Sequence, residues 1–335
     1  MSLAALNSPP LVASLGVALS IYGQAALETS PFFLKHHQWF NLVAYAINTV
    51  AVGIPGRIDG EVAKGIQAEN DAKKKKNDDE VVSSSNAATN SESAALLPRT
   101  GKTLVAPAGW AFAIWGPIFT GELAFVISQF FVKDKQLLAS QIQSISAPFV
   151  IAQLFQTLWC AAFRPKYTGN LMWISTGMLG GVAYYLSKAH AVFTSASSVR
   201  MIPGFSWWEY AIHFLPISLH FGWTTAATLV NLNGAVAVAD YRTSSNALIN
   251  VVGHASVVAA TALGVAITFS RQAPVYGGVI SWALFAVADG MRQRLAASSN
   301  GNNNVGAQRQ LILSTAGAYI SGLASFAAGL MPYWK

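Results

Sequence analysis

The chain has 335 residues, of which 53% are hydrophobic and only 10% are charged. A soluble domain usually carries about a quarter charged residues, so this composition excludes an ordinary soluble protein and indicates an integral membrane protein. The net charge is +7, but the basic residues lie between apolar runs and form no pattern suited to nucleic acid. An intrachain disulfide is excluded because Cys160 is the one cysteine.

Nine apolar runs approach the roughly 20 residues that a helix needs to cross a bilayer. They cover residues 11–28, 39–56, 107–131, 145–163, 171–193, 207–232, 247–269, 274–291 and 311–331. The first run either spans the membrane or is a leader, although it lacks the basic start of a secretory signal. The sequence therefore predicts an all-α, multi-pass integral membrane protein in contact with membrane lipid.

Residues 57–104 form one long linker that is polar, dense in charge and free of aromatic residues. Such a segment cannot bury enough apolar surface to fold alone, so we expect it to be disordered. If all nine runs cross the membrane, the side that holds this linker carries twice as many Lys and Arg residues as the other side. The positive-inside tendency then predicts that the linker is cytosolic. No sorting motif indicates which membrane holds the protein.

The third run begins with a proline and carries a carboxylate inside an apolar segment. Pro107 is expected in the first helical turn, where its missing N–H costs little. Pro117 lies about ten residues further on and is expected to kink the helix. Trp110 is suited to the membrane interface. Trp115 and Glu122 are separated by nearly two turns, so they share a face that should not point at lipid.

Two later runs carry a similar mixture of polar and aromatic residues. Gln153 and Gln156 fall within one helical stripe of the fourth run, and Trp159 lies beside it. In the sixth run, His220 is followed by Trp223, and Asn231 comes eight residues after the tryptophan. These groups either line an interior site or join neighbouring helices by hydrogen bonds.

The order and spacing of three segments resemble those of the TspO/MBR family, the tryptophan-rich sensory or translocator proteins. The segments are "PAGWAFAIWGPIF", "QLFQTLW" and "LPISLHFGWTTAATLVNLN", and the resemblance covers about residues 39–233. Pro107, Gly109, Trp110 and Trp115 fit the start of the family's second helix, and Trp223 and Asn231 keep the spacing of its fifth. The chain departs from the family at Gln156, where the family has Asn, and in its longer linker.

The resemblance implies a TspO-like five-helix bundle at 39–233, interrupted by the linker at 57–104. Residues 1–38 would then form an N-terminal apolar segment that adds one helix if it spans the membrane, and residues 234–335 would add about three transmembrane helices. The family's intramembrane pocket binds tetrapyrroles and, in some members, sterols and other hydrophobic molecules. A homodimer is left open. The residues that the resemblance and the polar faces together assign to the pocket are Trp110, Trp115, Glu122, Gln153, Gln156, Trp159, His220, Trp223 and Asn231.

No cofactor is expected to be required, and a porphyrin or haem would be a ligand, with His220 as a conceivable axial ligand of haem. No nucleophile setting, phosphate loop or metal-binding motif is apparent, so we expect the protein not to be an enzyme. A rival hypothesis makes it a secondary transporter or channel that uses Glu122, because a carboxylate deep in a membrane often marks a pathway. A third makes it a structural subunit of a membrane complex.

Overall fold

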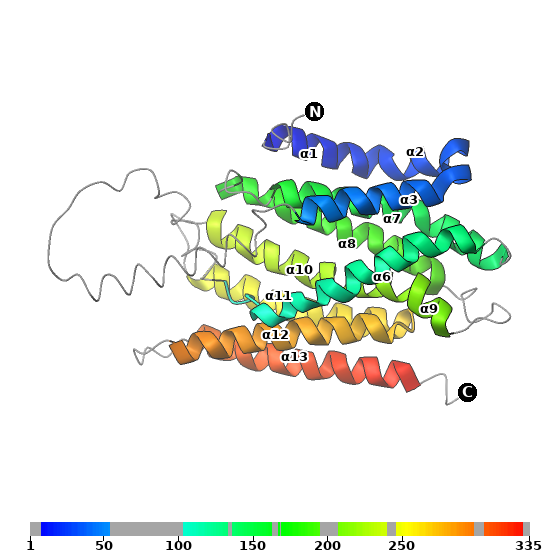
Figure 1. Cartoon of the computed structure of the whole chain (residues 1–335). Helices are drawn as coiled ribbons and strands as arrows, with labels where there is room; N and C mark the ends of the chain where they lie inside the picture. The colour runs from blue at the N-terminus through cyan, green and yellow to red at the C-terminus, as the bar shows by residue number, and fades with distance from the viewer. Residues whose placement is uncertain are drawn as a thin grey trace.

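The computed structural model describes residues 8–53, 103–132, 136–162, 167, 169–194, 207–239, 246–297 and 305–330. Within these ranges all regular secondary structure is helical, which confirms the all-α prediction. The long helices run side by side along one direction (Figure 1). The predicted disorder of the linker lies outside the described residues, except for its last two residues, Thr103 and Leu104. These two are buried in the fold.

The chain forms the following helices. The N-terminal element consists of α1 (Pro9–Ala18), the π-helical η2 (Leu19–Gly23) and α2 (Gln24–Glu28). The central helices are α3 (Pro31–Gly53), η3 (Gly109–Ile114), α6 (Trp115–Ser128), η4 (Gln129–Phe131), α7 (Gln136–Ala162), η5 (Gly169–Leu171), α8 (Met172–Thr194), α9 (Trp207–His213) and α10 (Leu215–Ala239). The last three are α11 (Asn246–Ser270), α12 (Pro274–Ala297) and α13 (Val305–Leu330).

Six of the described helical segments are long and apolar enough to cross a membrane. They are Pro9–Glu28, Gly109–Phe131, Gln136–Ala162, Ala247–Ser270, Pro274–Ala296 and Val305–Leu330. The protein is therefore a multi-pass integral membrane protein. The other three predicted runs correspond to α3, α8 and α10, which are of similar length. These helices carry buried polar residues such as Asn41, His190 and His220, which lower their hydropathy.

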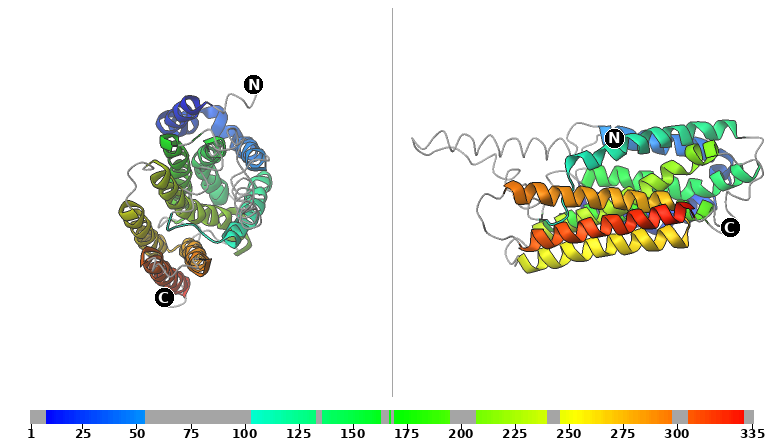
Figure 2. Two further views of the ribbon diagram at one scale, coloured as in Figure 1. Left: turned by 90° about the vertical axis from the view of Figure 1, so that its left-hand side faces the viewer. Right: turned by 90° about the horizontal axis from the view of Figure 1, so that it is seen from below.

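Five long helices pack around a common centre. Contacts run from α3 to α7, from α7 to α8, from α8 to α10, from α10 to α6 and from α6 back to α3. The N-terminal element lies outside this five-helix ring, against α7 and α8. Seen end-on, it lies on the side opposite to α11–α13 (Figure 2). The ring places residues of α6, α7 and α10 around one interior.

The three C-terminal helices share a core with the five-helix ring. Helices α11 and α12 pack on α10, and α13 packs on both of them. The approach between α10 and α12 is close at Gly222, where an added Cβ would come within 2.8 Å of Val279. One cluster of buried side chains runs from Phe155 of the ring to Ala318 of α13. The C-terminal region is thus continuous with the ring in packing.

The start of α6 differs from the sequence prediction. Residues 109–114 form a 3-10 helix, and the α-helix begins at Trp115. Pro117 therefore lies in the first turn of α6, where its missing N–H leaves no broken hydrogen bond. The expected kink at Pro117 stays a prediction. Pro216 lies just after a break between two helices, since α9 ends at His213 and α10 begins at Leu215.

The segment that precedes α6 lies along α12 and is held there by hydrogen bonds. The backbone N–H of Ala108 donates to the carbonyl of Ala286 at 2.8 Å, and Arg294 donates to the carbonyl of Thr103 at 2.7 Å. Gly290 of α12 permits this approach, because an added Cβ would overlap the carbonyl oxygen of Ala106. The position of α6 is therefore tied to α12.

We expect Gly290→Ala to lower the Tm of the detergent-solubilised protein, because the new methyl group must push the 103–108 segment away from α12. Overpacking of this kind typically costs about 1–3 kcal/mol. Gly177→Ala in α8 is the matched control, since nothing lies within 4 Å of a Cβ added there. Equal Tm values for the two variants would contradict the close contact.

Candidate functional site

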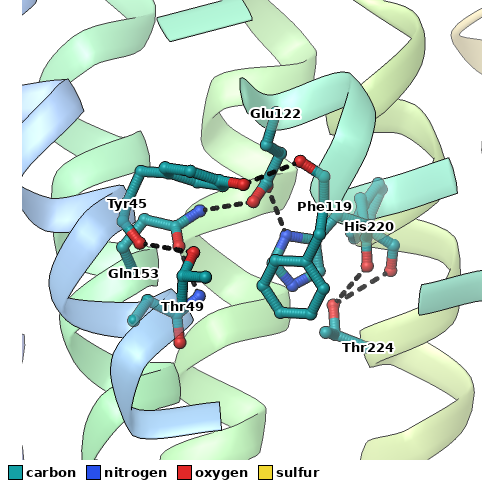
Figure 3. Close-up of polar contacts among 9 residues, drawn as sticks. Tyr45, Thr49, Phe119, Glu122, Gln153, His220 and Thr224 are labelled. Atoms are coloured by element: carbon teal, nitrogen blue, oxygen red, sulfur yellow. Dashed lines mark hydrogen bonds and ion pairs between the residues drawn. The ribbon is translucent and has the colours of Figure 1, made fainter. Parts of the chain in front are cut away.

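Glu122 of α6 is fully buried and is held by side chains from two other helices. Nε2 of Gln153, from α7, donates to Oε2 of Glu122 at 3.0 Å. Nδ1 of His220, from α10, lies 2.6 Å from Oε1. Figure 3 shows both side chains directed at the carboxyl group. The predicted residues Glu122, Gln153 and His220 are thus brought together at the centre of the five-helix ring.

The hydrogen bonds continue from Gln153 to the first helix of the ring. Asn48 of α3 donates to Oε1 of Gln153 at 2.5 Å, and the Tyr45 hydroxyl donates to the carbonyl oxygen of Phe119 on α6 at 2.9 Å. Asn48, Gln153, Glu122 and His220 therefore form one buried chain that joins α3, α7, α6 and α10. In a membrane such a chain supplies the partners that lipid cannot provide.

The contact between Glu122 and His220 lowers the free-energy cost of burying the Glu122 carboxyl group. An unpaired carboxylate at this depth would be costly. An imidazolium beside a carboxylate, or a neutral imidazole beside a protonated carboxyl group, leaves the pair with no net charge. Both arrangements place one proton at the interface of Glu122 and His220. Either arrangement avoids an isolated charge inside the bundle.

An aromatic group lies against this pair. The Trp115 ring contacts the His220 ring at 5.7 Å between centroids and the Trp223 ring at 6.1 Å, and it stacks on Phe119 at 5.4 Å. The edge-to-face and offset geometries are those that aromatic pairs prefer. The prediction that Trp115 and Glu122 occupy one inward face of the helix is confirmed.

Three of the predicted ligand residues carry buried polar atoms without a hydrogen-bond partner among the described residues. These atoms are both side-chain polar atoms of Gln156, Nε2 of His220 and Nε1 of Trp223. Gln156 and His220 are fully buried, and Trp223 is 3% exposed. Buried polar groups are seldom left unpaired, so these atoms could accept or donate hydrogen bonds to a ligand. Other helices also carry such atoms, among them Asn48 Oδ1 of α3 and His190 Nε2 of α8.

The remaining predicted residues lie elsewhere. Trp110 packs edge-to-face on Trp282 and donates from Nε1 to Asp289 at 3.0 Å, so it joins η3 to α12. Trp159 and Ser175 both donate to Oδ1 of Asn231, at 3.3 and 2.9 Å, and connect α7, α8 and α10. Trp110, Trp159 and Asn231 thus make interhelical hydrogen bonds outside the Glu122 cluster.

The sequence analysis missed the polar residues of α3. Asn41 donates to Gln129 and to Ser146, both at 2.8 Å, and Asn48 bonds to Gln153. Asn41 and Asn48 are fully buried. Their seven-residue spacing is the same signal that placed Trp115 and Glu122 on one face. It could have identified both asparagines.

In the part of the chain that the structure describes, no group of three or more His, Cys, Asp or Glu residues could hold a metal ion. Nδ1 of His220 is occupied by Glu122, whereas Nε2 has no partner. A carboxylate on one nitrogen is the arrangement that orients a histidine whose other nitrogen binds a metal. His220 could ligate the iron of a haem through Nε2 once this nitrogen has lost its proton, but the described residues offer no multi-residue metal site.

Two glutamines three residues apart on α7 should respond differently to the same substitution. Gln153→Leu removes the hydrogen bonds to Oε2 of Glu122 and from Nδ2 of Asn48 and leaves these two buried atoms unpaired, at a cost of about 1–3 kcal/mol per group. Gln156→Leu removes an amide that has no partner, so the ligand-free protein should keep its Tm or gain stability. Thermal unfolding in detergent measures both. An equal loss of Tm in the two variants would contradict the assigned network.

Comparison with known proteins gives one match. A family model described as "TSPO-like protein" matches residues 81–324. The matched range begins beyond α3 and extends into α13, so it includes most of the C-terminal helices as well as α6–α10. The predicted boundary at residue 233 stays a prediction. No curated protein and no solved structure matches significantly. Because the family match covers well over half of an all-α membrane chain, this protein belongs to the TSPO-like family.

Proposed function

We propose that the protein binds a flat, largely apolar ligand inside the five-helix ring, and that a tetrapyrrole suits this site better than a sterol. Binding would serve a sensory, regulatory or ligand-trafficking role in the membrane, and we propose no enzymatic reaction. The observation that carries the proposal is the set of unpaired buried atoms on Gln156, His220 and Trp223. The sequence independently predicts that these three residues line the pocket.

The energetic argument rests on the cost of unpaired polar groups. Each one typically costs about 1–3 kcal/mol when buried, and the bilayer offers no water to relieve it. A ligand with oxygen or nitrogen atoms on its edge would pair with these groups, so binding would recover part of that cost. A porphyrin carries carboxylates and ring nitrogens on an otherwise apolar frame, whereas a sterol carries little more than one hydroxyl group.

The indole rings favour a flat conjugated ligand over a flexible one. Trp115 is partly buried and Trp223 is almost fully buried. The Trp115 ring contacts the rings of both His220 and Trp223. Stacking on indole gives a rigid aromatic ligand a large contact area at a small entropic cost. For haem, the partner-free Nε2 of His220 adds a ligand for the iron.

A titration with protoporphyrin should quench tryptophan fluorescence saturably. We expect Trp115→Phe and Trp223→Phe to weaken binding. Trp173→Phe is the matched control, because Trp173 on α8 is 44% exposed on the outside of the ring. Gln156→Leu should weaken binding roughly fivefold to tenfold, as expected for one hydrogen bond, while leaving the ligand-free Tm unchanged or higher. Non-saturating quenching that is equal in all variants would contradict a defined site.

A second candidate function is proton-coupled transport. It is favoured by the buried chain from Asn48 through Gln153 and Glu122 to His220, because the Glu122–His220 pair can hold one proton. Proton relays in membrane proteins commonly use carboxylates and histidines in contact. These four hydrogen-bonded residues include one carboxylate, and the side-chain amides of Asn48 and Gln153 hold the Glu122–His220 pair in place. We therefore rank binding above transport.

Glu122→Gln distinguishes the two functions. A glutamine keeps the shape and can still bond to Gln153 and His220, so ligand binding should persist and stability should change by no more than about 1–2 kcal/mol. Reconstituted wild-type protein should show no proton-driven uptake of porphyrin. Saturable, pH-driven uptake into proteoliposomes that Glu122→Gln abolishes, with equilibrium binding intact, would move the protein into the transporter class.

A further inference from the structure

The turn between α11 and α12 packs against the five-helix ring and carries a second candidate site. Arg271 follows the last residue of α11, and Gln272 adopts a left-handed backbone conformation with φ of 49°. The N–H of Ala273 then bonds to the carbonyl of Thr268 at 2.9 Å, which closes the helix end. Arg271 lies immediately outside the spans Ala247–Ser270 and Pro274–Ala296, so we expect it to lie near the lipid headgroups when the protein is in a bilayer.

The guanidinium of Arg271 reaches across to α8 and α10. It donates from Nη1 to the carbonyl oxygen of Ser187 and from Nη2 to the Ser187 hydroxyl, both at 3.0 Å. Nη1 also lies 3.3 Å from Nδ1 of His190, and the guanidinium carbon lies 5.7 Å from the centroid of the Phe221 ring. Since a guanidinium only donates, His190 must accept this bond through an unprotonated Nδ1. Arg271 is thus oriented by groups of α8 and α10.

None of these partners carries a negative charge. A carbonyl oxygen, a hydroxyl, an imidazole that accepts through Nδ1 and a phenyl ring hold the guanidinium, but none of them neutralises it. Nε of Arg271 makes no hydrogen bond within the described residues, and the side chain stays partly exposed. Burial lowers the pKa of Arg271 from its usual value. That usual value is so high that the group remains charged at neutral pH.

The Arg271 guanidinium, whose hydrogen-bond partners among the described residues are all neutral, therefore creates a local excess of positive charge. Such an excess attracts anionic groups at a membrane surface.

We propose that Arg271 binds a phosphate group at the junction between α8, α10 and the turn that joins α11 to α12. Arginine presents a planar fork that matches phosphate geometry, and here two neutral contacts with Ser187 hold the fork in position while Nε stays available. The depth of the turn and the adjoining Phe221 ring suit the headgroup of an anionic lipid, whose acyl chains would lie along the bundle. A free phosphate monoester has the same chemistry and is the other source.

The test uses the full-length, delipidated protein in detergent and measures dissociation constants by native mass spectrometry. The probes are phosphatidylglycerol, a diacylglycerol with the same acyl chains but no phosphate, and glycerol phosphate with no acyl chains. Wild type should bind phosphatidylglycerol saturably, and Arg271→Gln should weaken this binding roughly tenfold, as expected for loss of a charge-assisted contact. Arg309→Gln is the matched control, because Arg309 is exposed near the start of α13, at the other end of the bundle.

Diacylglycerol should bind wild type and Arg271→Gln equally, because it carries no phosphate. Competition by glycerol phosphate would support the phosphate site and assign it a soluble ligand, whereas binding of phosphatidylglycerol without such competition would assign it a lipid. Equal affinity of wild type and Arg271→Gln for phosphatidylglycerol, or equal affinity of wild type for phosphatidylglycerol and diacylglycerol, would overturn the proposal.

Labelling of the wild-type protein with phenylglyoxal, read by peptide mass spectrometry, gives the same test if Arg271→Gln does not fold. Phosphatidylglycerol or glycerol phosphate should protect Arg271 and leave Arg309 reactive. Unchanged labelling of Arg271 at saturating concentrations of both compounds would also overturn the proposal.

Discussion

The burial of Glu122 is the constraint on which the interior of the ring depends. A carboxyl group at 0% exposure needs a partner that neutralises it and others that satisfy its remaining lone pairs. His220 supplies the first and Gln153 the second, and Asn48 in turn satisfies Gln153. Because the four residues come from four helices, the charge can be buried only when α3, α6, α7 and α10 stand in one relative arrangement. The hydrogen-bond chain therefore specifies the geometry of the ring in a solvent that provides little hydrophobic drive for helix association.

This hydrogen-bonded chain lies beside buried polar atoms that have no partner among the described residues. One turn beyond Gln153, the amide of Gln156 has no partner, and the far nitrogen of His220 and the indole nitrogen of Trp223 also lack one among the described residues. The contrast separates two roles on the same helices, since one group of polar atoms holds the helices together and the other remains available to a ligand. Residues 103–108 link this interior to α12, so the C-terminal helices take part in positioning α6 and its Trp115 and Glu122.

Much of the fold follows from the sequence, because apolar runs, helical periodicity and proline positions depend on local interactions. These features predict where helices form and which faces are buried. Spacing alone placed Trp115 and Glu122 on one inward face and Gln153 and Gln156 in one stripe. It could not say which stripe faces which, so the pairing of Glu122 with His220, 98 residues away, required the structure. The placing of Pro117 in the first turn of α6 also required the structure, because the start of the α-helix depends on where the preceding 3-10 segment ends. Trp110 fits the family pattern but packs on α12. This contact could not be predicted, because no local signal shows that a helix outside the family pattern lies against Trp110. Asn41 and Asn48 also share one face through their seven-residue spacing. Nothing in the sequence links that face to the site, because α3 carries no tryptophan signature of the family.

The central claim is that a flat ligand occupies the interior beside His220 and pairs with the indole nitrogen of Trp223. The most direct measurement is the ¹⁵N spectrum of indole groups in tryptophan-labelled protein, assigned by single Trp→Phe variants and followed as protoporphyrin is added. The account predicts large, saturable shifts for Trp115 and Trp223, because they would face the ring current and Trp223 would gain a hydrogen bond. Trp110, whose N–H is already bonded to Asp289, and the outward-facing Trp173 should hardly move. Shifts confined to Trp110, Trp173 or other outward-facing tryptophans, with Trp115 and Trp223 unchanged, would contradict it.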